Sequence, residues 1–291
     1  MLKKNPLVSV IINCHNGEKY LKDCINSIIH QTYKNWEIIF FDNNSTDTSH
    51  KILREYNDKR IKYHKSKKTF SLYKARNLAV KLCRGELVTF LDVDDWWIKK
   101  KLKTQIKVFQ KNYNLDILYS NIFLFFEKTK KKKIFIKKII NKNLTQNLIN
   151  KFEMPIQTVM IKKNFFQKLK FNNKYTIIGD FDYFIRASVK GKIIGLNEPL
   201  AYYRYHENNL TTKKISLNVK ELEHWIRYIK KKNDFINIDF KNIYNLINLL
   251  KIKKLIINKK IKTALIQIIK SPIGILRIKF LFLAFLSLIG F

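Results

Sequence analysis

The sequence contains few cysteines, prolines and glycines. Of its 291 residues, 3 are cysteine, 4 are proline and 7 are glycine. The cysteines follow neither a metal-binding nor a disulfide spacing, which excludes a disulfide-stapled scaffold and is typical of a reducing compartment. No proline- or glycine-rich linker and no internal repeat divides the chain, so we expect no tethered second domain. No Gly-x-Gly-x-x-Gly follows the first apolar run, which argues against a dinucleotide oxidoreductase.

Acidic residues are also scarce. The chain has 22 Asp and Glu against 58 Lys and Arg, a formal net charge of +36 at pH 7. Such a charge attracts polyanions, namely nucleic acid, anionic lipid or phosphorylated substrates. Lys, Asn and Ile are enriched together, as an A/T-rich genome would produce, and this composition explains the charge equally well. The hydrophobic content of 46% indicates a globular chain with a full core.

Long hydrophobic runs are missing except at the C-terminus. The first apolar run, residues 7–12, is too short for a signal peptide and is typical of a strand. Residues 273–291 are apolar apart from Arg277 and Lys279. The uncharged part of this tail would rise about 18 Å as a helix, against a bilayer core of about 30 Å. We therefore expect the tail to lie in a membrane interface; a helix packed on the protein, or a span with snorkelling basic residues, is the alternative.

Strand and helix patterns alternate through the first hundred residues. Ser71 is expected to cap one of the helices at its N-terminus, and Gly85 to stop that helix at its C-terminus. This alternation predicts an α/β fold with a mainly parallel sheet flanked by helices. The expected strands are residues 7–12, 36–41, 61–64 and 87–91, and the expected helices are residues 20–29, 48–56 and 71–83.

The second half of the chain is less regular. A lysine run over residues 128–138 predicts a basic hairpin, and the pattern beyond residue 215 is helical to the end. These features place a domain boundary near residue 212. The other expected elements are strands at residues 116–126, 193–196 and 200–205 and a helix at residues 181–189.

Three clusters of polar residues follow predicted strands. They are residues 13–17, 42–47 and 92–95. In open α/β sheets, ligands bind beyond the carboxyl ends of the strands, so the clusters should meet at one edge. Turn chemistry alone explains the Asn, Ser and Thr of the second cluster, but it explains Asp92, Asp94 and Asp95 poorly. Three carboxylates so close together favour a divalent cation that bridges a substrate's phosphates, over a solvated acidic turn.

Several stretches of the chain resemble the family 2 glycosyltransferases, which have the GT-A fold. They occur in the family's order and cover residues 5–210. The resemblance implies a nucleotide-binding half at residues 1–98, an acceptor half at residues 99–212 and a helical C-terminal region at residues 213–291. The matching stretches are VSVIINCHNGEKYL, QTYKNWEIIFFDNNSTDTS, KARNLA, GELVTFLDVDDWW, IIGDFDYFIR and EPLAYYRYHENN.

The resemblance implies a donor site on the first half of the chain. Asn13, His15 and Asn16 would line the nucleotide pocket. Asp42 would accept a hydrogen bond from a uracil-type base, and Arg76 would lie near the base or the phosphates.

Metal and phosphate ligands are implied further along the chain. Asp92 and Asp94 match the family's Asp-x-Asp, with Asp94 the principal ligand of Mn2+ or Mg2+ and Asp95 secondary or structural. His206 would be a metal ligand, a phosphate contact or simply structural, and Arg204 a phosphate contact or an ion-pair partner.

The implied catalytic base is a carboxylate near residue 180. Asp180 matches the aspartate of the family's Glu-Asp pair, but Gly179 replaces the glutamate. This departure leaves Asp182, in the first turn of the predicted helix, as the alternative base. Trp96 and Trp97 would border the sugar or acceptor cleft, or pack in the core.

The resemblance implies an inverting transferase that moves a sugar from a nucleoside diphosphate, UDP in the first instance, to a glycan or lipid-linked acceptor in cell-surface polysaccharide synthesis. With the apolar tail and basic run, it implies a cytoplasmic enzyme, peripheral on the inner face of the cell membrane, at an anionic lipid surface. A basic nucleic-acid-binding protein and a nucleotidyltransferase are the alternatives. No helix-turn-helix, zinc or RNA-binding signature supports the first, so no nucleic acid is expected. The sequence identifies neither the sugar nor the linkage.

Overall fold

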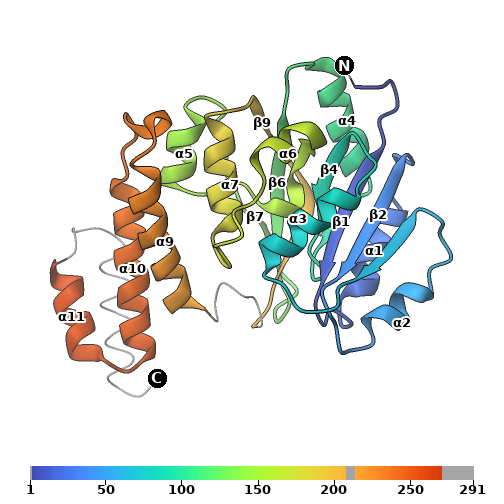
Figure 1. Ribbon diagram of the computed structural model, residues 1–291. Helices are drawn as coiled ribbons and strands as arrows, with labels where there is room; N and C mark the ends of the chain where they lie inside the picture. The colour runs from blue at the N-terminus through green and yellow to red at the C-terminus, as the bar shows by residue number, and fades with distance from the viewer. Residues whose placement is uncertain (1, 208–213, 271–291) are drawn as a thin grey trace. The chain divides into compact units, whose positions relative to one another are not determined.

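The computed structural model describes residues 2–207 and 214–270. These residues divide into two compact units (Figure 1). The first holds residues 2–148 and 152–207, and the second holds residues 149–151 and 214–270. All the predicted site residues belong to the first unit.

Within the described residues, nine strands form one mixed sheet in the first unit. β1 (Val8–Cys14), β2 (Trp36–Asp42), β3 (Ile61–Lys65) and β4 (Leu87–Phe90) run parallel. The order along the sheet is β3, β2, β1, β4, β8, β6, β9 and β5. The remaining strands are β5 (Trp96–Trp97), β6 (Ile117–Phe126), β8 (Met160–Lys162) and β9 (Ile193–Tyr205), with β7 (Lys132–Ile134) paired to β6. The predicted α/β fold is confirmed.

Helices cover both faces of the sheet. α1 (Leu21–Ile29) packs on the face of β1 and β2 that carries Val10 and Phe40. α3 (Leu72–Leu82) lies on the other face (Figure 1), where an aromatic cluster joins Tyr73 to Phe90 through Phe171. β1 and β2 are buried on both faces, which explains their nearly continuous apolar sequences. The other helices of this unit are α2 (Ser49–Arg54), α4 (Lys101–Lys111), α6 (Lys163–Leu169) and α7 (Gly179–Ser188), with a 3-10 turn at Ile156–Thr158. The first five residues of α5 (Leu144–Asn150) also belong to it.

Three local predictions need correction. Gly85 does not stop α3, which ends at Leu82 with Cys83 as its cap. A Cβ on Gly85 would lie 2.6 Å from the carbonyl oxygen of Leu7, so glycine is required there for close packing on β1. The strands expected at residues 193–196 and 200–205 are one strand, β9, because an irregular register opposite β6 absorbs the residues between them. α7 begins at Gly179, two residues before the expected start.

The second unit is helical, as the pattern beyond residue 215 predicts. It consists of α9 (Ile215–Ile229), α10 (Lys241–Ile257) and α11 (Ile261–Lys270), with a 3-10 turn at Asn233–Phe235. None of the helices in the described ranges is long and apolar enough to cross a bilayer. The apolar tail predicted at residues 273–291 lies outside the described residues.

Candidate active site

The turns that follow β1 and β2 are bound to each other. Asn16 adopts a left-handed conformation with φ of 57°. Its side-chain oxygen accepts a hydrogen bond from the backbone N–H of Thr46 at 2.8 Å. The backbone N–H of Gly17 donates to Ser49 Oγ at 3.0 Å, and His15 Nδ1 lies 3.1 Å from the carbonyl oxygen of Asn43. The two polar clusters predicted at these strand ends therefore form one surface.

Asn13 and Asp42 lie at the ends of the two strands that lead into these turns. Asp42 is fully buried and accepts hydrogen bonds from the Ser45 backbone N–H and the Tyr63 hydroxyl, each at 2.7 Å. In the described part of the chain, neither the nitrogen nor the oxygen of the Asn13 amide has a hydrogen-bond partner, although both are buried. An unpaired buried amide costs about 1–3 kcal/mol, so Asn13 is a group that a polar ligand would satisfy.

Arg76 and Asp92 form a partly buried ion pair. The Arg76 guanidinium, which is 2% exposed, donates to Asp92 Oδ1 at 2.6 Å. Asp92 is the first residue of the loop at residues 92–95 after β4, here called the acidic loop, and its side chain is 35% exposed. The arginine thus reaches from α3 into the acidic loop and leaves part of the carboxylate open to solvent.

Asp94, within the acidic loop, contacts His206, which follows β9. His206 Nε2 lies 3.0 Å from Asp94 Oδ2, and the Tyr20 ring packs against the imidazole with a centroid separation of 5.2 Å. Burial, with the negative charge of Asp92, raises the pKa of Asp94. A bound cation would relieve this repulsion, because it favours the charged carboxylates.

The donor set at this point suits a cation shared with a substrate. Within residues 2–207 and 214–270, no group of three or more His, Cys, Asp and Glu side chains is arranged to hold a metal ion by itself. A hard divalent cation is commonly bound by one or two carboxylates, with substrate phosphates completing its shell. Asp94 with His206 or Asp92 fits that second arrangement.

Arg204 fastens the acidic loop to β9. Its backbone N–H donates to Asp95 Oδ1 at 2.8 Å and its Nε to the carbonyl oxygen of Asp94 at 2.9 Å. Its Nη2 donates to Asp23 on α1 at 2.7 Å. Asp95 is 1% exposed, and burial, followed by the charges of Asp94 and Asp92, raises its pKa well above the ordinary range. Sequence reasoning missed Asp23, whose only signal was an acidic residue in the first turn of α1.

The two tryptophans after the acidic loop differ. Trp97 is 3% exposed and donates from Nε1 to the carbonyl oxygen of Gln157, as expected of a core residue. Trp96 is only partly buried and stacks on Tyr202 with a centroid separation of 4.8 Å. Trp96 is therefore the one available to border a cleft.

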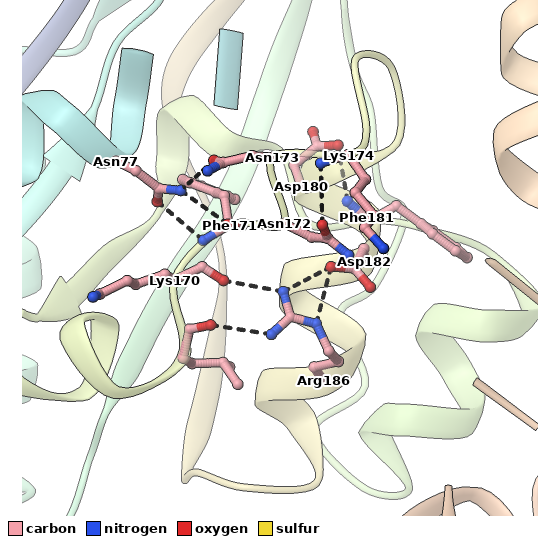
Figure 2. A network of polar contacts seen from close by, with 11 residues as sticks. Asn77, Lys170, Phe171, Asn172, Asn173, Lys174, Asp180, Phe181, Asp182 and Arg186 are labelled. Atoms are coloured by element: carbon pink, nitrogen blue, oxygen red, sulfur yellow. Dashed lines mark hydrogen bonds and ion pairs between the residues drawn. The ribbon is translucent and has the colours of Figure 1, made fainter. Parts of the chain in front are cut away.

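Asp180 lies in the first turn of α7, next to the ion pair of Arg76 and Asp92. Its Oδ1 accepts hydrogen bonds from the Phe181 backbone N–H at 2.8 Å and the Tyr73 hydroxyl at 3.1 Å. Burial raises the pKa of Asp180, and the positive charge of Arg76 opposes that rise. Figure 2 shows Asp180 at the N-terminal end of this helix.

Asp182 points into a different network, which Figure 2 also shows. The side chain is fully buried, and its Oδ2 accepts from Arg186 Nε at 2.9 Å and Nη2 at 2.7 Å. Arg186 also donates to the carbonyl oxygens of Leu169 and Lys170. Asp182 thereby anchors the preceding loop to α7.

The structure joins the predicted residues into two neighbouring groups. Asp92 connects the acidic loop with the first turn of α7: it is ion-paired with Arg76, and its negative charge raises the pKa of both Asp94 and Asp180. The turns after β1 and β2 adjoin them, since a Cβ on Gly17 would lie 3.0 Å from the side chain of Val93 in the acidic loop. A separate open pocket of about 610 Å³ lies beside Phe41, Phe70 and Leu82, and none of the predicted site residues lines it.

Known proteins share both this sequence pattern and this fold. A family model described as glycosyl transferase family 2 matches residues 9–187. An uncharacterised glycosyltransferase of Methanocaldococcus jannaschii is 33% identical over 62% of this chain and 64% of its own length. The enzyme WfgD of Escherichia coli, a UDP-Glc:alpha-D-GlcNAc-diphosphoundecaprenol beta-1,3-glucosyltransferase, is 29% identical over 83% of this chain and 91% of its own length.

Solved structures agree on the fold. S. aureus TarS in complex with UDP-GlcNAc has a TM-score of 0.62 at 18% identity, covering 85% of this chain and 71% of its own. The mannosyltransferase PcManGT from Pyrobaculum calidifontis, in complex with GDP-Man and Mn2+, has a TM-score of 0.65 at 15% identity, covering 98% of this chain and 81% of its own. Neither a nucleic-acid-binding protein nor a nucleotidyltransferase finds support among these matches. With the acidic loop after β4 and the polar turns after β1 and β2 at one sheet edge, the family match shows that this chain is a glycosyltransferase of family 2.

Proposed function

We propose that the chain transfers a sugar, with inversion, from a UDP-sugar to a lipid-linked or glycan acceptor in a metal-dependent reaction. The observation that carries this proposal is the meeting of the turns after β1 and β2 with Asp92, Asp94, Arg76 and Asp180 at one edge of the sheet. The activity of WfgD supports a UDP-linked donor and a lipid-linked acceptor, and the TarS complex supports a UDP-sugar.

The donor's base would lie over the turns after β1 and β2. Asp42 keeps acceptor capacity, because a carboxylate offers about four lone-pair sites and two are used by Ser45 and Tyr63. The unpaired amide of Asn13 supplies both a donor and an acceptor nearby. His15 and Asn16 would shape the pocket through their links to the second turn.

The diphosphate would lie along the acidic loop. Asp94 would hold a Mn2+ or Mg2+ ion, with His206 or Asp92 as the second protein ligand. When bound, such an ion would neutralise the charge that develops on the departing nucleoside diphosphate. Arg76 adds a fixed positive charge beside it, and Arg204 holds the loop in place. PcManGT, which has this fold and binds Mn2+, supports the assignment.

Asp180 would be the general base. It would take the proton of the acceptor hydroxyl as that oxygen attacks the sugar, a contribution of about 10²–10⁴ in rate. Its raised pKa suits a base, whereas Asp182 is engaged with Arg186. Asp180→Asn should therefore bind donor normally and lose transfer, while Asp182→Asn should mainly lose stability. An active Asp180→Asn variant together with a folded but inactive Asp182→Asn variant would assign the base to Asp182.

A panel of nucleotides tests the donor assignment. UDP and UDP-sugars, with Mn2+, should raise the melting temperature of the wild-type chain, since a ligand at 100 times its Kd stabilises the native state by about 2.7 kcal/mol. GDP and GDP-mannose should give a smaller shift. Asp94→Ala should abolish the part of the shift that needs Mn2+. A shift that is equal with chelator, or seen only with guanine nucleotides, would contradict the metal or the UDP assignment respectively.

The enzyme would work on the cytoplasmic face of the membrane, bound peripherally to anionic lipid. The lysines around the β6–β7 hairpin are exposed, and each basic residue near an anionic surface contributes about 1 kcal/mol. The apolar sequence of residues 273–291 would add a second attachment.

A further inference from the structure

Gly179 is required by the ring of Tyr73. A Cβ built on Gly179 would lie 2.3 Å from Tyr73 Cδ2 and 2.4 Å from Cε2, far inside van der Waals contact. The φ of this glycine is not left-handed, so a lack of space, and not the backbone conformation, excludes a side chain. Gly179, which replaces the glutamate of the family's Glu-Asp pair, is therefore matched to the ring of Tyr73 in α3, more than a hundred residues earlier in the chain.

Tyr73 has little freedom to move. It is 2% exposed, and its ring packs against Phe171 with a centroid separation of 5.3 Å. Its hydroxyl lies 3.0 Å from the carbonyl oxygen of Ile177 and 3.1 Å from Asp180 Oδ1. The phenol thus joins the backbone before α7 to the carboxylate in its first turn.

The hydrogen bonds around Asp180 distinguish its two oxygens. Oδ1 accepts from the Phe181 backbone N–H, and it shares the single proton of the Tyr73 hydroxyl with the carbonyl oxygen of Ile177. Among the described residues, no hydrogen bond to Asp180 goes to Oδ2. A carboxylate held at one oxygen by two donors presents the other oxygen in a defined direction.

We propose that Tyr73 is the positioning residue of the general base, holding Asp180 by Oδ1 so that Oδ2 receives the proton of the acceptor hydroxyl. This inference rests on the proposed function of Asp180. As the acceptor oxygen forms its bond to the anomeric carbon, the bond from that carbon to the diphosphate oxygen breaks, and the acceptor proton moves to Oδ2. Tyr73 keeps its own proton throughout, and burial together with the charge of Asp180 favours the neutral phenol.

The replacement Tyr73→Phe tests this role, because it keeps the ring and removes only the hydroxyl. A hydrogen bond to a carboxylate stabilises its charged form, so losing it should raise the pKa of Asp180. We expect kcat to fall about tenfold to a hundredfold. The acidic limb of the kcat/KM profile should move to higher pH, with KM for the donor unchanged.

Tyr33→Phe is the matched control. Its hydroxyl also donates to a backbone carbonyl oxygen, that of Pro6, and among the described residues it makes no hydrogen bond to a carboxylate. It should leave both kcat and the pH profile as in wild type, and donor-induced thermal shifts should confirm that both variants fold. A Tyr73→Phe enzyme whose acidic limb does not move, while Asp180→Asn is inactive, would overturn the role of Tyr73 and leave the proposed function intact. An active Asp180→Asn enzyme would instead overturn the base assignment itself.

Discussion

Replacing Gly179 with alanine should disturb both stability and activity through a single contact. The new methyl group would meet Tyr73 Cδ2 at 2.3 Å, and the ring is confined by Phe171. Overpacking of this kind costs about 1–3 kcal/mol. Alanine regains about 1 kcal/mol of helix propensity over glycine, so the net loss of stability should be about 0–2 kcal/mol. The displaced phenol would also leave Asp180, so kcat should fall as in Tyr73→Phe.

Urea denaturation of a double-mutant cycle measures the contact. The four proteins are wild type, Gly179→Ala, Tyr73→Ala and the double variant. Tyr73→Ala should cost about 3–5 kcal/mol, which a domain of ordinary stability tolerates. Without the ring, alanine at position 179 meets open space, and Gly179→Ala should become neutral or stabilising. The coupling free energy should therefore be about 1–3 kcal/mol.

Additivity would refute the reasoning. If the two substitutions add to within about 0.5 kcal/mol, the ring of Tyr73 is not what excludes a side chain at Gly179. A Gly179→Ala variant with wild-type stability and wild-type kcat would contradict the inference more directly.

Other perturbations have equally definite outcomes. Lys101 is fully buried against Trp97, with Thr89 and Gln105 as hydrogen-bond partners, and burial lowers its pKa well below 10.5. The Lys101 ammonium proton binds more readily to the unfolded chain, so the unfolding free energy of the wild type should fall as the pH drops below 10.5. The unfolding free energy of Lys101→Met, taken relative to that of the wild type, should rise over the same range. A difference between the two proteins that does not change with pH in urea titrations would contradict this expectation. Arg76→Gln should raise the pKa of Asp180 and move the acidic limb of kcat/KM to higher pH, and an unmoved limb would count against their coupling. Deleting residues 273–291 should release the protein from membranes in a flotation assay, and a truncated chain that still floats with anionic vesicles would show that the tail is not needed.

Local sequence patterns were sufficient for most of the first half of the fold. Apolar runs buried on both faces identified β1 and β2, and polar clusters directly after strands predicted the edge at which the candidate site residues come together. These predictions succeed because strand periodicity and turn chemistry act between near neighbours in the chain. The acidic loop was visible for the same reason: Asp92, Asp94 and Asp95 are crowded in sequence, whatever the fold. The division of roles among the site residues and the domain boundary near residue 212 stay predictions.

Only the tertiary structure decided how these local pieces are joined. The pairing of Tyr73 with Asp180 spans 107 positions, and that of Arg204 with Asp23 spans 181, so no window of sequence contains both partners. Gly85 has the pattern of a helix stop, but its function is to let two backbones approach, which depends on where β1 lies. Asp180 and Asp182 share a helix turn and look equivalent in sequence. They differ because Arg186 holds one carboxylate, while Tyr73 and Arg76 surround the other, and that distinction arises only when distant segments pack together.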